Sequence, residues 1–202
     1  MPPGASAAAV QKFVGTHRQW IHRRIQDLST AAGVVDDSRP ETIHLPAIAR
    51  RYTVEYEHRP GRSADVSVRD GNLLVTGPLH NDRAILVALR RWLAQVADVE
   101  LTRQLCEVAR TDGFQFSRLQ IRRQRTRWGS CSAAGTISLN VCLLFLRPPV
   151  VRYLLVHELC HTKHMNHSPR FWSLVAHHEP DYKALDRELL RGWQAVPGWM
   201  FA

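Results

Sequence analysis

Apolar residues recur with the period of a helix in several long segments of this chain. In residues 10–28 and 82–111 they lie three or four positions apart, so each segment can bury one face of a helix. Asn81 or Asp82 is expected to cap the second of these helices, because a short polar side chain can accept a hydrogen bond from the first turn. Gly113 is expected to end it.

A period of two replaces the helical period between these two segments. Polar and apolar residues alternate over 52–57 and 64–69, and Asp70-Gly71 favours a tight turn before a further strand at 72–76. The sequence therefore predicts a small antiparallel β unit.

The second half of the chain mixes strands and helices. Residues 119–124 and 136–145 are predicted strands, joined by a connector rich in small residues. A helix is predicted over 148–163, because the two prolines at its start are tolerated in a first helical turn. Ser168 followed by Pro169 predicts the start of another helix.

Composition narrows the class of protein. The chain has 202 residues, of which 45% are hydrophobic and 22% charged, values typical of a globular protein and not of a disordered chain, a collagen or a coiled-coil rod. No run approaches the ~18 apolar residues of a membrane helix, and we recognise no signal peptide, so we expect no membrane partner. The four cysteines show no CxxC spacing, which indicates reduced thiols and a cytoplasmic protein.

We expect an α+β fold with three parts packed together, since the length suits one domain. Residues 1–40 would form an N-terminal helix and a connector, residues 41–80 the β unit, and residues 81–202 a larger core.

Positive charge is in excess. Lys and Arg outnumber Asp and Glu by 27 to 18, a formal net charge of +9 that favours acidic or polyanionic partners, although solvated surface arginines would give the same balance. The segment from Arg118 to Arg127 holds five arginines and no acidic residue. Arg125 and Arg127 are candidate ligands of an anionic substrate, and the segment is a candidate contact for a nucleotide or nucleic acid. The alternative is a solvated or structurally paired role.

The motif His157-Glu158-Leu159-Cys160-His161 lies on the helix predicted over 148–163. Residues four apart lie on one face of a helix, so His157 and His161 can direct both imidazoles at one ion. Glu158 is rotated by about 100° from His157, which places it beside a water molecule on that ion without binding the metal itself. Zinc suits two imidazoles and acidifies such a water molecule, and the carboxylate can then act as general base.

A catalytic zinc site needs a third protein ligand. His167 follows His161 by six residues, so the chain can turn back and place His167 opposite the other two histidines. We favour His167 as this ligand, with Glu179 on a later helix as the alternative. Neither His177 nor His178 is expected to bind the metal.

Four sequence blocks identify a family resemblance when they are taken in order: Thr126–Ser132, Gly135–Asn140, His157–His161 and Met165–Trp172. On these blocks the chain resembles the YgjP-like metallopeptidases from about residue 9 to about residue 190. That family is similar to the SprT and Spartan proteases and to the wider zincins. The resemblance implies a zincin-like fold, in which a mixed β-sheet packs on the helix that carries the two spaced histidines.

The resemblance also implies an activity. It is that of a zinc metallopeptidase acting on peptide or protein substrates, with the three histidines as ligands and Glu158 as general base. It further implies that residues 135–140 form an edge strand above the active-site helix, where an extended peptide can pair through its main chain. Asn140 would either orient the substrate or cap local structure.

Other functions can use the same residues. With the arginines as a clamp, the metal site could hydrolyse a phosphoanhydride in a nucleoside triphosphate, and the similarity to Spartan suggests a protease recruited by DNA. A non-enzymatic nucleic-acid module with a structural metal is not favoured, because the sequence has no zinc-finger spacing, aromatic RNA-binding motif or helix-turn-helix.

Overall fold

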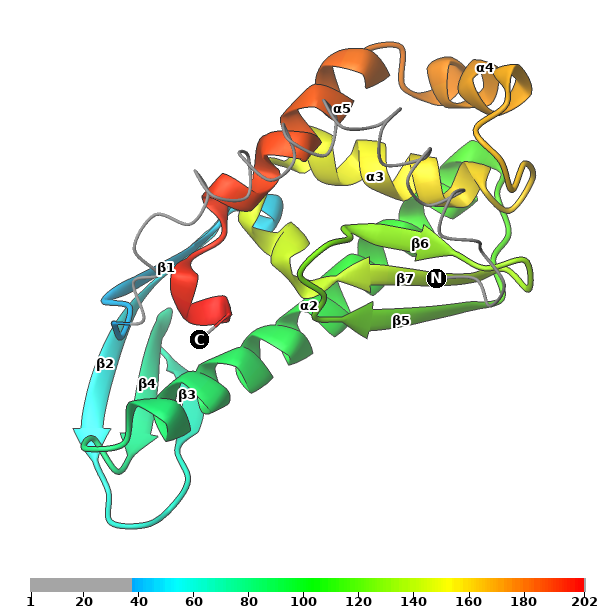
Figure 1. Ribbon diagram of the computed structural model, residues 1–202. Coiled ribbons are helices and arrows are strands. Elements are labelled where there is room, and N and C mark those ends of the chain that lie inside the picture. Colours follow the sequence, from blue (N-terminus) through cyan, green and yellow to red (C-terminus); the bar gives the residue numbers. More distant parts are fainter. Residues whose placement is uncertain (1–37, 202) are drawn as a thin grey trace, which may run out of the picture. The chain divides into compact units, whose positions relative to one another are not determined.

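A computed structural model of the chain describes residues 38–201 (Figure 1). The helix predicted over residues 10–28 therefore lies outside the described part of the chain. The described residues form two small β-sheets, one long helix that contacts both sheets, and three shorter α-helices.

The first sheet is mixed, and not wholly antiparallel as the alternating pattern predicts. Its strands lie in the order β1-β2-β4-β3, with the bounds β1 Thr42–Leu45, β2 Arg50–His58, β3 Asp65–Arg69 and β4 Asn72–Gly77. β3 and β4 form the expected hairpin, whereas β2 and β4 run parallel, with Val54 opposite Leu73. β4 is buried and strongly apolar while β3 is mostly exposed, so β4 takes the inner position, where a strand is covered more fully.

Helix α2 (Asp82–Asp112) begins and ends where the sequence predicts. The Asn81 side chain accepts a hydrogen bond of 3.0 Å from the Ala84 N–H, and Gly113 ends the helix in the left-handed conformation, with φ of 72°. Leucines on one face of α2 are fully buried, and the helix contacts strands of both sheets. The helix therefore links the two sheets of the described part.

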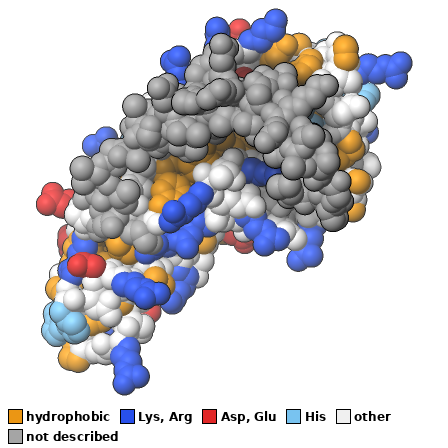
Figure 2. Space-filling view, in the orientation of Figure 1, with side chains coloured by type: hydrophobic (Ala, Val, Ile, Leu, Met, Phe, Trp, Pro, Cys, Tyr) orange, Lys and Arg blue, Asp and Glu red, His pale blue; other side chains and the backbone are white. Residues whose placement is uncertain are grey.

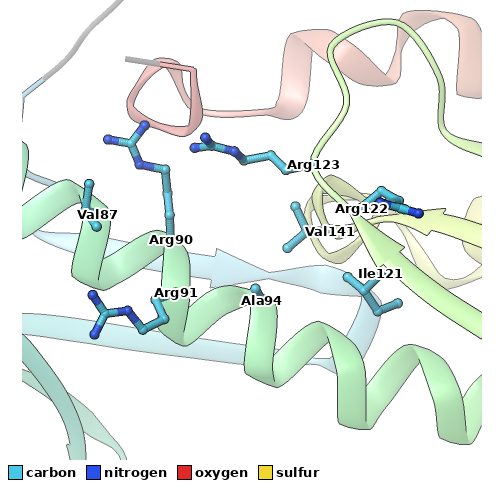
Figure 3. Close-up of a pocket in the computed structure, with 8 residues that line it drawn as sticks. All are labelled: Val87, Arg90, Arg91, Ala94, Ile121, Arg122, Arg123 and Val141. Atoms are coloured by element: carbon cyan, nitrogen blue, oxygen red, sulfur yellow. The ribbon is translucent and has the colours of Figure 1, made fainter.

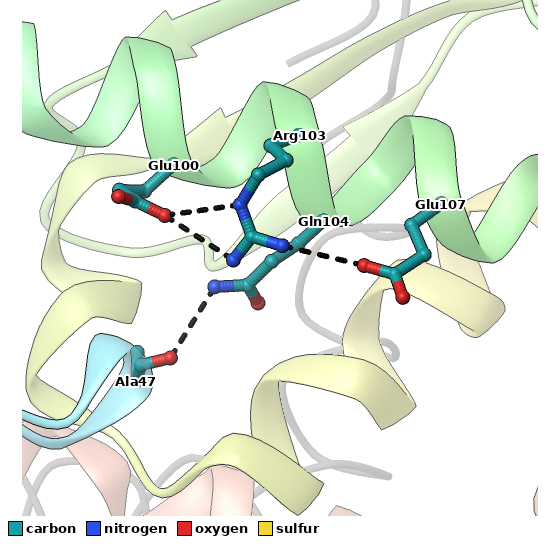
Figure 4. Close-up of polar contacts among 5 residues, drawn as sticks. All are labelled: Ala47, Glu100, Arg103, Gln104 and Glu107. Atoms are coloured by element: carbon teal, nitrogen blue, oxygen red, sulfur yellow. Dashed lines mark hydrogen bonds and ion pairs between the residues drawn. The ribbon is translucent and has the colours of Figure 1, made fainter.

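Polar contacts fix the outer face of α2 and tie it to the first sheet (Figure 4). Arg103 lies 3.3 Å from both Glu100 and Glu107, which flank it by one helical turn on either side. Pairs of this kind stabilise a helix by about 0.2–0.5 kcal/mol each. The neighbouring Gln104 donates a hydrogen bond of 3.3 Å to the carbonyl of Ala47, in the short connection between β1 and β2.

The second sheet holds three strands in the order β5-β7-β6, with the bounds β5 Arg118–Arg122, β6 Gly129–Cys131 and β7 Thr136–Asn140. β7 is central, parallel to β5 and antiparallel to β6. The strand predicted over 136–145 is therefore too long: it ends at Asn140, and Val141–Phe145 form a 3₁₀-helix. The sequence places β6 in a connector, because a three-residue strand of small residues carries no alternating pattern.

Asn140 explains why β7 ends where it does. Its side chain is 2% exposed, and its Nδ2 donates hydrogen bonds of 2.7 Å to the carbonyls of Gln124 and Arg127. Its Oδ1 accepts a hydrogen bond of 3.0 Å from the Cys142 N–H, at the start of the 3₁₀-helix. One amide thus fixes the loop between β5 and β6 and caps the segment after β7.

Three helices complete the described part: α3 Pro148–Cys160, α4 Pro169–His178 and α5 Tyr182–Arg191. α3 has the two predicted prolines in its first turn and ends at Cys160, three residues before the predicted end. Ser168 caps α4 as predicted, by accepting a hydrogen bond of 3.4 Å from the Phe171 N–H. α5 is an addition to the elements that the sequence predicts.

α3 contacts β6 of the second sheet, and it also contacts both α4 and α5 (Figure 1). Leu154, Leu155 and Val156 are buried there. The expected α+β fold, with a mixed sheet packed on the helix that carries His157 and His161, is confirmed. Among the described residues, no helix combines the length and the apolar character that crossing a bilayer requires.

Replacing Asn140 with Ala should destabilise the protein by about 2–4 kcal/mol, because it leaves two carbonyls and one N–H without their buried partner. Urea unfolding followed by tryptophan fluorescence measures this change. Gln95→Ala, at an exposed position of α2, is the matched control and should change the free energy of unfolding by less than ~0.5 kcal/mol. Equal stability of the two variants would contradict the structural role of Asn140.

Candidate active site

Three histidines converge where α3 ends. His157 and His161 lie one helical turn apart on α3, and His167 lies in the loop just before α4. One ring nitrogen of each lies within 4.8 Å of the other two, and the Nε2 atoms of His157 and His167 are 3.1 Å apart. Within residues 38–201, this is the group of His, Cys, Asp and Glu side chains that could hold a metal ion.

Hydrogen bonds determine which nitrogen is free on each helix histidine. His161 Nδ1 lies 3.1 Å from the carbonyl oxygen of His164, which can only accept, so Nδ1 carries the hydrogen and Nε2 keeps its lone pair. The Tyr153 hydroxyl donates to Asp186 at 2.8 Å and lies 3.4 Å from His157 Nδ1. Having given its hydrogen to Asp186, the hydroxyl accepts from His157 Nδ1–H, and Nε2 of His157 is free as well.

Burial keeps the two helix histidines uncharged. Desolvation and the neighbouring imidazoles lower the pKa of His157 to about 3. Desolvation also lowers the pKa of His161 below its usual value. The neutral imidazole is the form that binds a metal ion, so neither ligand has to lose a proton near neutral pH.

Aromatic side chains of α4 hold the histidine rings in place. The Phe171 ring stacks on His161 with 4.5 Å between centroids, and the Trp172 ring stacks on His167 with 5.4 Å between centroids. Phe171 is fully buried. Because His167 directly precedes the Ser168 cap of α4, the same helix start that positions these rings also positions the third histidine.

The Glu158 side chain lies against β6. It is 4% exposed, and a Cβ atom on Gly129 would come within 2.5 Å of Glu158 Oε1, so only glycine leaves room for the carboxylate there. Oε2 has no hydrogen-bond partner among the described residues, and burial raises the pKa of Glu158 to about 8. An unpartnered buried carboxyl group is costly, and a cation beside it would offset that cost.

The alternative third ligand, Glu179, is engaged elsewhere. Its Oε1 lies 2.6 Å from Arg152 Nε, and the same guanidinium lies 3.1 Å from Asp112 at the end of α2. His178 lies 3.7 Å from Asp112 and belongs to this second cluster. The structure therefore brings His167, and not Glu179, to the pair on α3.

The basic segment 118–127 contributes largely to the fold. Arg123 donates a hydrogen bond of 3.3 Å to the Met200 carbonyl. Arg125 donates to the Phe201 carbonyl and lies over the Phe201 ring, 5.6 Å from its centroid. Arg127 is exposed and makes no side-chain hydrogen bond or ion pair within residues 38–201. The contacts of Arg125 stabilise the C-terminal turn. The structure gives no support for a nucleic-acid partner of this segment.

The strand beside Glu158 is β6, and the expected edge strand over 135–140 is a misassignment. β7 pairs with a strand on each side, so its main chain is not available to a peptide. Among residues 38–201, β6 pairs with β7 alone, and it contacts α3. The assignment fails because β5 pairs with the other side of β7 in a parallel register, which no local pattern reveals. The contacts of Asn140 likewise favour the capping interpretation over substrate binding.

Three residues of the site escape the sequence analysis: Gly129, Tyr153 and Asp186. Tyr153 has a sequence signal, since it lies four residues before His157 on the same face of α3. Gly129 lies in the block Thr126–Ser132 that carries the family resemblance, but no local pattern indicates its contact with Glu158. Asp186 has no signal, because it meets the site only through the packing of α5 on α3.

Comparisons with known proteins identify the family. A family model described as YgjP-like, metallopeptidase domain, matches residues 1–191. No curated protein matches the chain. Among solved structures, the crystal structure of the metallopeptidase zymogen of Pyrococcus abyssi abylysin is 27% identical, with 44% of this chain and 90% of that chain covered and a TM-score of 0.40. Because the family model spans nearly the whole sequence, the chain belongs to the YgjP-like metallopeptidase family.

Proposed function

We propose that this metallopeptidase depends on zinc and cleaves peptide bonds with Glu158 as general base. The three histidines of the site would hold the ion. The observation that carries the proposal is the meeting of three imidazole nitrogens at the end of a helix that also carries a buried carboxylate, one oxygen of which has no partner within residues 38–201. The three imidazoles and the buried carboxyl group of Glu158 both support a bound cation at the end of α3.

The spacing of one pair of nitrogens fits zinc. Two nitrogen ligands of a tetrahedral zinc ion, each ~2.0–2.1 Å from the metal, lie about 3.3 Å apart. The Nε2 atoms of His157 and His167 are 3.1 Å apart, which is close to this value. Imidazole ligands suit zinc and other transition metals, whereas calcium and magnesium prefer oxygen ligands. A site of three histidines therefore favours zinc over either of those ions.

Glu158 would handle the protons of the reaction. A bound zinc ion supplies Lewis acidity, which lowers the pKa of a water molecule toward ~7 and polarises a carbonyl group. The Glu158 carboxylate takes the proton of the attacking water and passes it to the leaving amine. Burial raises the pKa of Glu158 to about 8, so the charge of a cation bound by the neutral histidines is what would keep the carboxylate ionised at neutral pH.

β6 would hold the substrate. Within residues 38–201 it pairs only with β7, so one side of its main chain is open to an extended peptide. Gly129 on this strand adjoins the Glu158 carboxylate. A peptide paired with β6 would therefore pass beside the general base.

Replacing Glu158 with Gln should leave zinc binding unchanged and lower the rate of peptide cleavage by about 10²–10⁴-fold, because the amide cannot accept the proton. Mass spectrometry of an unfolded protein incubated with the zinc-loaded enzyme, alongside a nucleoside triphosphate mixture, measures cleavage. Metal analysis measures zinc. Undiminished cleavage by the variant would disprove the role of Glu158, and nucleoside mono- or diphosphates in place of peptide fragments would replace peptide hydrolysis with phosphohydrolysis.

Replacing Tyr153 with Phe should weaken zinc binding by about 10–100-fold, because His157 Nδ1–H loses its acceptor and the ring loses its fixed orientation. Competition with a chromophoric chelator measures the zinc dissociation constant. Tyr182→Phe is the matched control, since this ring also packs at the site, on Trp172, but its hydroxyl makes no hydrogen bond in the described part. Equal zinc affinity of the two variants would rule out orientation of His157 by Tyr153.

Replacing Gly129 with Ala should lower kcat by about 100-fold while the zinc content stays the same. The new methyl group would displace the Glu158 carboxylate, and a shift of ~1 Å in a catalytic group is enough for such a loss. Ser130→Ala, on the same strand, is the control and should retain most of the activity. The steric argument fails if both variants cleave peptide at the same rate.

A further inference from the structure

A basic groove lies between α2 and the edge strand β5 (Figure 3). Its volume is about 350 Å³, and eight residues line it. Half of the lining side chains are apolar and half are arginine: Val87, Ala94, Ile121 and Val141, with Arg90, Arg91, Arg122 and Arg123. None of these eight described residues is acidic.

Within residues 38–201, no carboxylate forms an ion pair with three of the four arginines of the groove. Figure 3 shows the guanidinium groups of Arg90 and Arg123 directed to the same rim, although one comes from α2 and the other from the segment after β5. Arg91, Arg122 and Arg123 form no ion pair with a carboxylate within residues 38–201. Figure 2 shows Lys and Arg side chains gathered along the middle of the face in view. Such a surface attracts anionic groups, and arginine binds carboxylates in a bidentate manner.

The apolar residues of the groove indicate which kind of anionic ligand it can bind. Val87 is 44% exposed, and Ile121 is half-buried, so both present apolar surface to the groove. A free phosphate would leave that surface in contact with water. Single-stranded nucleic acid is held by stacking on aromatic side chains, and none of the eight lining residues is aromatic. A peptide with both acidic and apolar side chains can satisfy the arginines and cover the apolar surface together.

The groove and the metal site lie at opposite edges of one sheet. β5 borders the groove, β7 is central, and β6 adjoins Glu158. Neighbouring strands are ~4.8 Å apart, so the two edge strands are separated by about 10 Å. The two sites are therefore distinct, yet close enough for one polypeptide to reach both.

We propose that the groove is an exosite for acidic segments of protein substrates. Carboxylates of the substrate pair with Arg91, Arg122 and Arg123 while adjacent apolar side chains rest on Val87 and Ile121, and a neighbouring stretch of the same substrate enters the metal site. Cleavage at the second site rests on the function proposed above, whereas binding at the groove does not.

Binding is best measured with the full-length, zinc-loaded Glu158→Gln protein, which leaves the probe intact. The probe is a fluorescein-labelled peptide of Glu and Leu, followed by fluorescence anisotropy, with a Gln-and-Leu peptide as the neutral comparison. Arg91→Gln combined with Arg122→Gln removes two charges from the groove without touching the contact of Arg123 with Met200. Arg50→Gln combined with Arg51→Gln removes two exposed charges from β2 and is the matched control.

The acidic peptide should bind, and the groove variant should raise its dissociation constant by about tenfold, as expected for two exposed charge pairs. The control variant should leave it unchanged. Equal weakening by both variants, binding of the neutral peptide with the same affinity, or no binding at all would overturn the exosite. Displacement of the peptide by lower concentrations of a single-stranded oligonucleotide would reassign the groove to nucleic acid.

Cleavage assays separate this proposal from the proposed mechanism. With the unmodified Glu158, an acidic extension on a test substrate should lower KM in the parent protein and not in the groove variant, at unchanged kcat. Groove-dependent binding without cleavage of any substrate would leave the exosite standing and refute the zinc mechanism. Cleavage with the same KM whether or not the substrate carries the acidic extension would refute the exosite and leave the zinc mechanism standing.

Discussion

The buried carboxyl group of Glu158 is the constraint on which the site depends. A carboxylate removed from water costs several kcal/mol unless partners replace the lost hydration, and one Glu158 oxygen has none among the described residues. The close approach of β6 at Gly129 causes this burial, because it excludes water and leaves no space for a side chain. Glu158 directly follows His157 on α3, so a cation held by the three histidines, as proposed above, would offset the cost of this burial.

Helix α3 can hold a buried carboxyl group in place because it is more deeply buried than α4 or α5. Leu154, Leu155 and Val156 are buried against its neighbours. His157 and His161, the proposed metal ligands on α3, are therefore held by a rigid element, which positions side chains more precisely than a loop does. Tyr153 is also buried in α3, and its hydroxyl donates a hydrogen bond to Asp186 on α5 while lying 3.4 Å from His157 Nδ1, so the packing of α5 on α3 also affects the orientation of His157. A change in the packing of α5 on α3 would therefore also change the surroundings of His157, one of the proposed metal ligands.

The sequence predicts those features that local spacing controls. The face shared by His157 and His161, the Asn81 and Ser168 caps and the Asp70-Gly71 turn follow from contacts within a few residues. Pairings between distant segments escape it. The parallel pairing of β2 with β4 and of β5 with β7, and hence the identity of the edge strand, depend on which strand is most deeply buried. His167 lies between these cases, because its spacing permits a ligand role but the start of α4 and the Trp172 ring fix its position.

The order of strands in the second sheet also places two proposed tasks of the peptidase, peptide cleavage and substrate recognition, at different edges. The β6 edge adjoins Glu158, the proposed general base, whereas the β5 edge adjoins a groove in which charge and apolar surface are combined. Contacts at a site remote from the reacting atoms stabilise bound substrate and transition state alike, so they act on KM and not on the chemical step. Asn140 lies at the end of the central strand, and its side chain donates hydrogen bonds to the loop that connects β5 with β6. It therefore fixes the position of one edge strand relative to the other. A fold of this kind can alter its choice of substrate at the arginine groove while the geometry around Glu158 stays fixed.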